Sequence, residues 1–261
     1  MSPGGKETAR RNLDDFTRRA SQFDKEVRAE EAALLAEAIS GSGFGPGCVA
    51  VDMGAGAGAS ARPFLQAGGR VVGVDLTPAM AQKAVKRLAE EGFGGRALFT
   101  VAPAERPPIR EGAADATLCR NVFHHFENPR AVLGEMARAV RPGGHVFVID
   151  YYDPEDAAQR KILNRIEYLR VSSHVRTLSL GEFRQIYEAA ELHLLDPVTL
   201  AAPGQFADWM KGGDASPENH AATLDEMENL CAAGGGWWEV EGEGGAMMFT
   251  RKRVILVGRK E

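Results

Sequence analysis

Short apolar runs alternate with amphipathic helical patterns along the first 150 residues of the chain. Five of these runs are almost wholly apolar: Cys48–Met53, Arg70–Asp75, Ala97–Val101, Ala114–Cys119 and His145–Asp150. The segments between them begin like helices, as at Thr77-Pro78 and Asn128-Pro129, where a capping side chain precedes a proline suited to a first helical turn. Apolar strands separated by helices predict a doubly wound α/β fold, with a parallel sheet covered on both faces.

The alternation breaks after Tyr152. Leu192–Leu200 and Arg253–Gly258 predict two more strands, which makes a sheet of seven mostly parallel strands. The remaining patterns predict helices over Pro154–Leu169, Ser179–Ala190 and Ala201–Ala233, with a loop at Gly212–Pro217, and a glycine-turned hairpin over Trp237–Phe249. This half of the chain therefore mixes extra strands with inserted helices.

The N-terminal region carries its own helical stripe. Leu13, Phe16, Ala20, Phe23 and Val27 recur at steps of three and four residues, as in one amphipathic helix or two short ones. From these patterns we expect three parts, listed here by residue number: an N-terminal helical segment (1–45) covering the ligand site, a core (46–153 and 180–200 with 246–261), and a substrate cap made of insertions (154–179 and 201–245).

Composition excludes several classes of protein. The 261 residues carry a net charge of −5, which disfavours a nucleic-acid partner. No run approaches the roughly 20 apolar residues of a membrane span, and the first residues lack the pattern of a signal peptide, so we expect a cytoplasmic protein without a membrane partner. The three cysteines and six histidines show no ligand spacing, so we expect reduced core cysteines and no metal.

A glycine turn follows the first predicted strand. Gly54, Gly56 and Gly58 alternate there and lead into a helix, so the backbone can turn sharply and present free N–H groups to a ligand. Asp75 lies about twenty residues further on, at the end of the next strand, where a carboxylate can accept both hydroxyls of a ribose. Thr77 already supplies a helix cap, which favours ribose binding over capping for Asp75. The pattern predicts a nucleotide-like ligand.

Two enzyme classes share this pattern. Gly54, Gly56 and Ala59 also satisfy the dinucleotide-binding form, so an NAD(P)-dependent oxidoreductase is an alternative. The acidic Asp52 inside the strand and the alternation of glycines through Gly58 count against it.

Longer motifs carry a specific resemblance: VDMGAGAGAS, GVDLTPAM, APAERPPI, CRNVFHHF and EMARAVRPGGHVFVID. Together they resemble the class I S-adenosylmethionine-dependent methyltransferases, and within them the branch near the ubiquinone and menaquinone C-methyltransferases. The resemblance covers Phe16 to Asp150, and NRIEYLRVSSHVRTLSLGEF is similar to an insertion of related small-molecule members. It implies a Rossmann-like core and S-adenosyl-L-methionine as cofactor.

The resemblance also implies which residues hold the cofactor. Gly54, Gly56 and Gly58 would cradle its methionine end, Asp52 its amino group, Asp75 with Leu76 the ribose, Ala104 and Glu105 the adenine, and Phe16 and Phe23 would fold over it. One position departs from the family, because Pro103 stands where an acidic residue usually meets the adenine amino group. Its polar partner is therefore not identified.

Polar residues at the ends of later strands are further site candidates. Arg120 and Asn121 end the fourth predicted strand, where their side chains reach either the cofactor carboxylate or the substrate. The alternative for Arg120 is an ion pair with a surface acid. Tyr151, Tyr152 and Asp153 follow the fifth strand and are candidates on the acceptor side.

Three histidines are candidate general bases. His125 is the first choice, followed by His124 and by His174 in the inserted segment. Of the adjacent pair, we expect one histidine to be structural and only the other to face the pocket. For His174, an exposed loop position is an equal alternative.

The sequence thus predicts an enzyme that transfers a methyl group from S-adenosylmethionine to a carbon or oxygen of a small, flat or apolar molecule. A sulfonium already activates the methyl group, so alignment matters more than acid-base chemistry. The alternatives are the NAD(P)-dependent oxidoreductase and a non-catalytic cofactor-binding protein of the same fold. RNA methylation is disfavoured by the acidity of the chain. We expect a monomer or homodimer.

Overall fold

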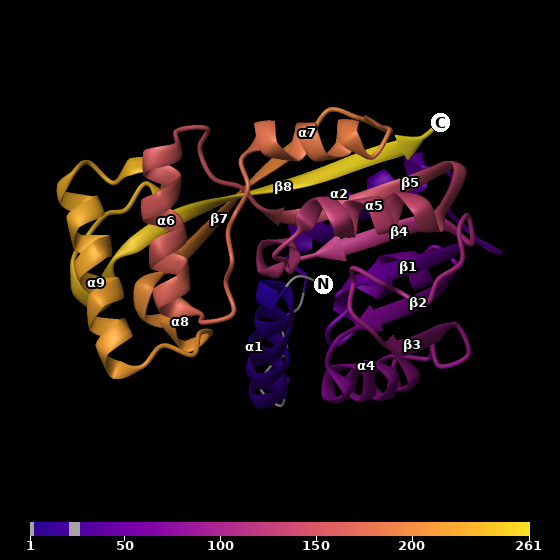
Figure 1. Cartoon of the computed structure of the whole chain (residues 1–261), viewed down its shortest axis with the longest axis horizontal. Helices are drawn as coiled ribbons and strands as arrows, with labels where there is room; N and C mark the ends of the chain where they lie inside the picture. Colours follow the sequence, from indigo (N-terminus) through magenta and orange to yellow (C-terminus); the bar gives the residue numbers. More distant parts are fainter. Residues whose placement is uncertain (1–2, 21–26) are drawn as a thin grey trace.

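The computed structural model describes residues 3–20 and 27–261. Its strands form one sheet in the order β3-β2-β1-β4-β5-β8-β6, with β7 also paired to β8 (Figure 1). The parallel strands are β1 (Val49–Met53), β2 (Arg70–Asp75), β3 (Ala97–Val101), β4 (Ala114–Arg120) and β5 (Val140–Tyr151). The order reverses between β1 and β4, so their carboxyl ends flank a crevice suited to a ligand.

Helices cover both faces of the sheet, which confirms the expected doubly wound α/β fold. Apolar side chains of α5 (Pro129–Ala139) and α7 (Leu180–Ala189) pack on one face. Those of α2 (Ala29–Gly41) and α3 (Arg62–Gln66) pack on the other, and α4 (Pro78–Glu90) follows β2. The two apolar layers fix the strands, and with them the loops at their carboxyl ends.

The described sheet has eight strands rather than the seven predicted. The predicted strand Leu192–Leu200 is divided into β6 (Leu192–Leu194) and β7 (Val198–Gln205), both antiparallel to β8 (Met248–Lys260). The register changes by one residue between them, because Leu194 lies opposite Gly258 and Val198 opposite Ile255. Pro197 lies in this interruption and has no N–H to donate to the ladder.

β7 and β8 continue beyond the parallel strands and lead into a separate cap (Figure 1). The cap contains α6 (Ala157–Arg170), α8 (Phe206–Lys211) and α9 (Pro217–Ala232). It has an apolar core of its own, which includes Leu163, Phe206, Met227, Trp238 and Phe249. Most residues of this core are distinct from the two apolar layers on the sheet, and Trp237 packs against both the cap core and one of those layers.

Two predictions for this region were wrong. Residues 201–205 are strand and not helix, because they pair with the first half of β8, which begins at Met248 and not at Arg253. Trp237–Phe249 is not a hairpin: it contains two short 3-10 helices and a single bridge between Glu241 and Met248. Positive φ angles at Gly236 and Glu239 turn the chain away from an extended conformation.

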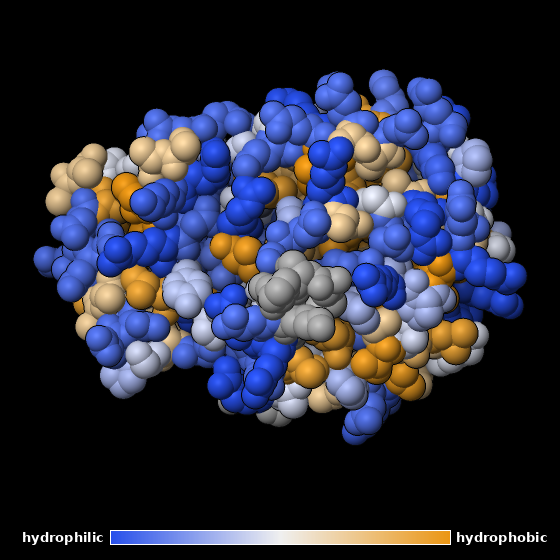
Figure 2. Space-filling view, viewed as in Figure 1, coloured by the Kyte–Doolittle hydropathy of each residue, from blue (hydrophilic) through white to orange (hydrophobic). Residues whose placement is uncertain are grey.

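α1 (Pro3–Arg19) lies between the cap and the sheet (Figure 1). The Arg19 guanidinium donates to the Gly212 carbonyl of the cap, and Lys83 of α4 donates to the Ala20 carbonyl. Hydrophilic side chains cover most of this face of the molecule, and apolar ones gather near α4 and the edge strand β3, where Leu98 and Val101 are exposed (Figure 2). α1 is therefore placed to cover the crevice.

Candidate functional site

The glycine turn after β1 forms one wall of a cavity of about 460 Å³, which is within the usual size range of ligand sites. Gly54 and Gly56 line this cavity with φ angles of 73° and 50°. A Cβ on Gly54 would lie 2.6 Å from Val122 Cγ1, whereas a Cβ on Gly56 would meet no protein atom within 4 Å. Gly56 therefore faces open space that a ligand can fill.

Gly58 packs against α4 and not against the cavity. It is not among the residues that line the cavity, and a Cβ there would lie 3.1 Å from the Ala84 Cβ of α4. With a φ of 80°, this glycine lets the turn pack closely on α4. A direct cradle by Gly58 is therefore not supported.

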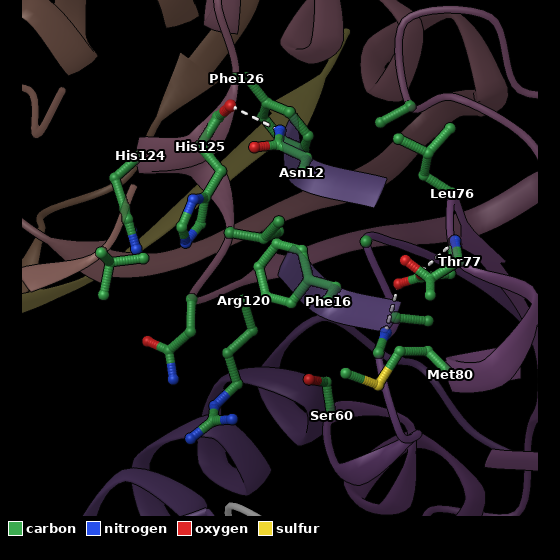
Figure 3. Close-up of a pocket in the computed structure, with 18 of the residues that line it drawn as sticks. Asn12, Phe16, Ser60, Leu76, Thr77, Met80, Arg120, His124, His125 and Phe126 are labelled. Atoms are coloured by element: carbon green, nitrogen blue, oxygen red, sulfur yellow. Dashed lines mark hydrogen bonds between the residues drawn. The ribbon is translucent and has the colours of Figure 1, made fainter. Parts of the chain in front are cut away.

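Asp75 braces the turn. Its Oδ2 accepts the Gly56 N–H at 2.7 Å, and its Oδ1 accepts the Thr77 N–H at 2.8 Å (Figure 3). Burial raises the pKa of Asp75, and these two hydrogen bonds oppose that rise. The Thr77 side chain makes no cap bond, so the assumption that Thr77 alone caps α4 was wrong. A carboxylate oxygen can accept more than one hydrogen bond, so Asp75 can also accept from a ribose hydroxyl.

Asp52 lies behind the turn, is 1% exposed and does not itself line the cavity. Neither carboxylate oxygen has a hydrogen-bond partner among the described residues. Burial, and then the charge of Asp75, raise the pKa of Asp52 to about 7, while Arg120 opposes the rise. A buried carboxylate without a partner next to an open glycine turn fits a ligand that brings an ammonium group, as the amino end of S-adenosylmethionine does.

Apolar side chains form the other end of the cavity. Leu76, Met80, Pro103 and Ala104 line it, with Glu105 at its side. No carboxylate stands at Pro103 itself, and the nearest acidic residue in the chain is Glu105. This end is suited to a flat base, which would lie against the short loops after β2 and β3.

α1 closes the cavity over the turn. The Phe16 ring meets the His125 ring edge-on, with centroids 5.1 Å apart, and Asn12 Nδ2 donates to the His125 carbonyl at 3.1 Å (Figure 3). Phe16 and Asn12 both line the cavity. The predicted partner Phe23 lies outside the described residues. Of the two aromatic residues predicted to cover the cofactor, Phe16 lies at the cavity.

Arg120 also faces the cavity, but it does not pair with a surface acid. Its Nε lies 2.5 Å from Oε1 of Glu31 in α2, a residue that is 1% exposed. Glu31 also pairs with Arg253 of β8 at 2.9 Å, and Arg253 donates to Asn121 Oδ1 at 2.7 Å. Asn121 takes a φ of 55°, so the chain turns sharply where β4 ends. Arg120 and Asn121, the two residues predicted at the end of this strand, are therefore held in place by a buried network of ion pairs and hydrogen bonds.

The histidine that faces the cavity with a carboxylate partner is His124, in the short 3-10 turn Phe123–His125. Its Nδ1 lies 2.7 Å from Oδ1 of the buried Asp150, and its backbone N–H donates to Oδ2. Burial alone would raise the pKa of Asp150, but His124 and the Tyr151 N–H bring it below the ordinary value. A carboxylate at Nδ1 leaves Nε2 as the proton acceptor.

Both members of the adjacent pair line the cavity, not one as expected, and His125 and His174 are each more enclosed than His124. His125 Nδ1 donates to the Ser173 carbonyl at 2.9 Å, and burial, followed by the charge of His124, holds its pKa well below the ordinary value. His174 Nε2 donates to Asn164 Oδ1, an atom that also accepts the Thr177 N–H. Burial lowers the pKa of His174 to about 3, and His174 does not line the cavity. The structure thus disfavours His125 and His174 as bases, and the exposed-loop alternative for His174 was wrong.

Five arginines of the cavity wall were missed as site residues in the sequence: Arg19, Arg28, Arg170, Arg251 and Arg253. Arg170 of α6 and Arg251 of β8 both contact Glu167, at 3.3 Å and 2.6 Å. The signal was present, because Arg251 and Arg253 alternate along a strand and so share one face. Tyr151 lies with them at the cavity, whereas Tyr152 and Asp153 do not line it.

No metal site or membrane span emerges from the described part of the chain. Within residues 3–20 and 27–261, no group of three or more His, Cys, Asp or Glu side chains is placed to hold a metal ion. Over the same ranges, no helix has the length and apolar character needed to cross a bilayer.

Comparison with known proteins identifies the class. Residues 51–148 match the family described as methyltransferase domain. The uncharacterized methyltransferase YcgJ of Bacillus subtilis is 33% identical over 219 residues, which are 80% of this chain and 83% of that protein. Its crystal structure superposes with a TM-score of 0.80 at 25% identity, covering 90% of this chain and all of that one.

Two further relatives agree with this class. The demethylmenaquinone methyltransferase of Thermus thermophilus is 31% identical over 127 residues, 48% of this chain and 56% of that protein. A geranyl diphosphate methyltransferase, solved in complex with S-adenosylmethionine, shares the fold, with a TM-score of 0.62 at 18% identity over 88% of this chain and 86% of that one.

The chain belongs to the methyltransferase family. The expectation of an S-adenosylmethionine-dependent enzyme related to the quinone C-methyltransferases is confirmed, and the NAD(P)-dependent oxidoreductase is set aside.

Proposed function

We propose that this enzyme transfers a methyl group from S-adenosylmethionine to a carbon or oxygen of a small molecule, and that His124 accepts the proton which that atom releases. The observation that carries this proposal is the pair of His124 and Asp150 at the wall of the cavity, 2.7 Å apart. A positioned general base with a suitable pKa typically accelerates a reaction about 10²–10⁴-fold.

The cofactor takes the glycine side of the cavity. Asp52 pairs with its amino group, Gly54 and Gly56 allow its methionine end to approach the backbone, and Asp75 accepts its ribose hydroxyls. The unpartnered Asp52 carboxylate and the open space at Gly56 support this placement. When bound, S-adenosylmethionine supplies a methyl group that its sulfonium has already activated.

His124 is oriented for its role by the groups around it. Asp150 accepts both the ring Nδ1–H and the backbone N–H of His124, which fixes the position and the tautomer of the ring. The His125 ring lies 4.4 Å from it, centroid to centroid, and limits its movement. Nε2 is then held ready to take a proton from an acceptor in the cavity.

α1 and the cap keep water away from the reacting atoms. Phe16 covers the turn from one side, and Arg170 and Trp209 of the cap line the other. Since methyl transfer depends on alignment of the acceptor, methyl carbon and sulfur, a closed site favours it over hydrolysis.

The experiment is a single-turnover methyl-transfer assay on the whole enzyme. Methyl-labelled S-adenosylmethionine is incubated with a panel of phenols, enols and hydroxybenzoates, and label is counted in the organic products. We expect His124→Gln to lower the transfer rate about 100-fold or more while the Kd for S-adenosylhomocysteine stays within about twofold. The control is His193→Gln, because His193 is exposed on β6. Transfer by His124→Gln at the wild-type rate removes His124 from the chemistry.

A further inference from the structure

Four arginines at the cavity are held by only two carboxylates. Glu31 bridges Arg120 and Arg253, at 2.5 Å and 2.9 Å. In the cap, Glu167 bridges Arg170 and Arg251 in the same way. Each carboxylate is 3% exposed or less, so the two bridges lie in the interior. Each bridge therefore joins two positive charges through one negative charge.

The arginines of these two bridges face the ligand space, whereas the two glutamates do not. All four arginines line the cavity, whereas Glu31 and Glu167 are absent from its wall. The four carboxylates that do line it lie elsewhere: Asp75 and Glu105 follow β2 and β3 at the cofactor end, Glu127 is exposed after the turn Phe123–His125, and Asp208 pairs with Lys211. The side of the cavity formed by β8 and α6 therefore presents guanidinium groups to whatever binds there.

Hydrogen-bond donors on this side lack acceptors. Arg253 is 3% exposed, yet its Nε has no partner among the described residues. The Trp209 Nε1–H is also buried without a partner within residues 3–20 and 27–261. Trp209 stacks under the Arg170 guanidinium, 4.5 Å from its ring centroid. Buried donors without acceptors cost free energy, and a ligand rich in oxygen acceptors removes that cost.

Tyr151 lies in the middle of these charges. The Arg251 guanidinium sits 3.4 Å above its ring centroid, and that of Arg253 lies 5.0 Å away. Burial alone would raise the pKa of Tyr151, but the two arginines bring it below the ordinary value. A phenol whose ionised form is stabilised in this way reports a locally positive potential, and the same potential favours any anion placed beside it.

We propose that the methyl acceptor carries an oxyanion, a carboxylate or a phosphate group, which Arg251 and Arg253 bind beside Tyr151 while the atom to be methylated faces His124. This inference rests on the proposed function, since it assigns the cofactor to the glycine side. Planar guanidinium groups match carboxylate and phosphate oxygens in geometry as well as in charge. The acceptor is thus an anionic small molecule, which refines the flat or apolar one predicted from the sequence.

The test is isothermal titration of the enzyme saturated with S-adenosylhomocysteine, at constant ionic strength. The probes are benzoate, phenyl phosphate and the neutral benzamide, which has nearly the shape of benzoate. We expect at least one anion to bind about tenfold or more tightly than benzamide. Tighter binding of benzoate identifies a carboxylate as the recognised group, and tighter binding of phenyl phosphate identifies a phosphate.

Variants locate the site. Arg251→Gln and Arg253→Gln should each abolish most of the preference for the anion, and Arg251→Lys should keep part of it. Arg176→Gln is the matched control, because Arg176 pairs with Glu182 away from the cavity. The Kd of S-adenosylhomocysteine is measured for every variant, and a wild-type value shows that the fold and the cofactor site are intact.

Several outcomes overturn the inference without touching the proposed function. These are equal binding of benzamide and both anions, no anion binding up to millimolar concentration, and an anion preference that survives both glutamine variants. Anion binding that disappears once S-adenosylhomocysteine is present would assign the arginines to the cofactor carboxylate instead. Failure of S-adenosylhomocysteine itself to bind the wild-type enzyme would contradict the proposed function.

Discussion

Replacing Asp52 with Asn should stabilise the ligand-free enzyme and weaken cofactor binding at the same time. The carboxylate is 1% exposed and has no hydrogen-bond partner among the described residues, and burial raises its pKa from 3.8 to about 7. That rise corresponds to about 4 kcal/mol, the cost of ionising Asp52 in the folded protein relative to the unfolded chain. The carboxylate is therefore kept at the expense of stability.

The sign of the pH dependence follows from the raised pKa. Between about pH 4 and pH 7 the folded protein holds a proton at Asp52 that the unfolded chain has lost, so stability falls as the pH rises through this window. Above pH 7 the whole penalty is present. Asp52→Asn removes it, and we expect the free energy of unfolding at pH 8 to rise by about 2–4 kcal/mol, less than the full amount because a buried amide also lacks partners.

Cofactor binding should change in the opposite direction. If the ionised Asp52 pairs with the amino group, about one tenth of the wild-type enzyme is competent at pH 6, and S-adenosylhomocysteine should bind about tenfold more weakly there than at pH 8. Asp52→Asn should bind about 10–100-fold more weakly than wild type at pH 8, with little change between pH 6 and pH 8. Urea unfolding and isothermal titration at both pH values measure the two effects.

Asp153→Asn is the matched control. Burial raises the pKa of Asp153 to about 7 as well, but this residue follows β5, where its N–H donates to the Leu178 carbonyl, and does not lie behind the glycine turn. We expect this variant to gain stability at pH 8 and to keep the wild-type pH dependence of cofactor binding. The reasoning is refuted if Asp52→Asn binds S-adenosylhomocysteine with wild-type affinity and wild-type pH dependence.

Two further predictions concern the turn and the buried network. The Cβ of Gly54→Ala would lie 2.6 Å from Val122 Cγ1, so this variant should lose about 2–3 kcal/mol of stability. Gly56→Ala should lose only about 1 kcal/mol and yet bind S-adenosylhomocysteine about tenfold more weakly. Equal binding by Gly56→Ala and wild type would count against a ligand at that glycine. Glu31→Gln leaves two buried guanidiniums without their shared charge and should cost about 3–5 kcal/mol in urea unfolding; a loss below about 1 kcal/mol would show that the bridge matters little.

The parallel core was predictable because its sequence pattern is local. Each apolar strand is short, and capping residues mark where the helices between them begin. Asn128, for example, caps α5 by accepting the Ala131 N–H. The full length of the β7–β8 ribbon was not predictable in this way, although parts of both strands were predicted. Its residues pair with partners about fifty positions away, so tertiary pairing decides their conformation, and Ala201–Gln205 becomes strand although the local pattern favours a helix.

The candidate site was predicted unevenly for a similar reason. Asp75 and the glycines Gly54 and Gly56 belong to a compact motif, so their positions followed from spacing. The choice between His124 and His125 depended on Asp150 and on the Ser173 carbonyl, which lie far along the chain. The pairs of Glu31 with Arg120 and Arg253, and of Glu167 with Arg251, likewise join distant segments, so spacing in the sequence does not indicate these partners.

The most direct measurement of the central claim is a crystal structure of the enzyme with S-adenosylhomocysteine. The account predicts the ribose at Asp75, the adenine between Leu76, Met80 and Ala104, and the sulfur facing the space beside His124 and Tyr151. Adenine bound against Arg251 and Tyr151, or a sulfur turned away from His124, would contradict it.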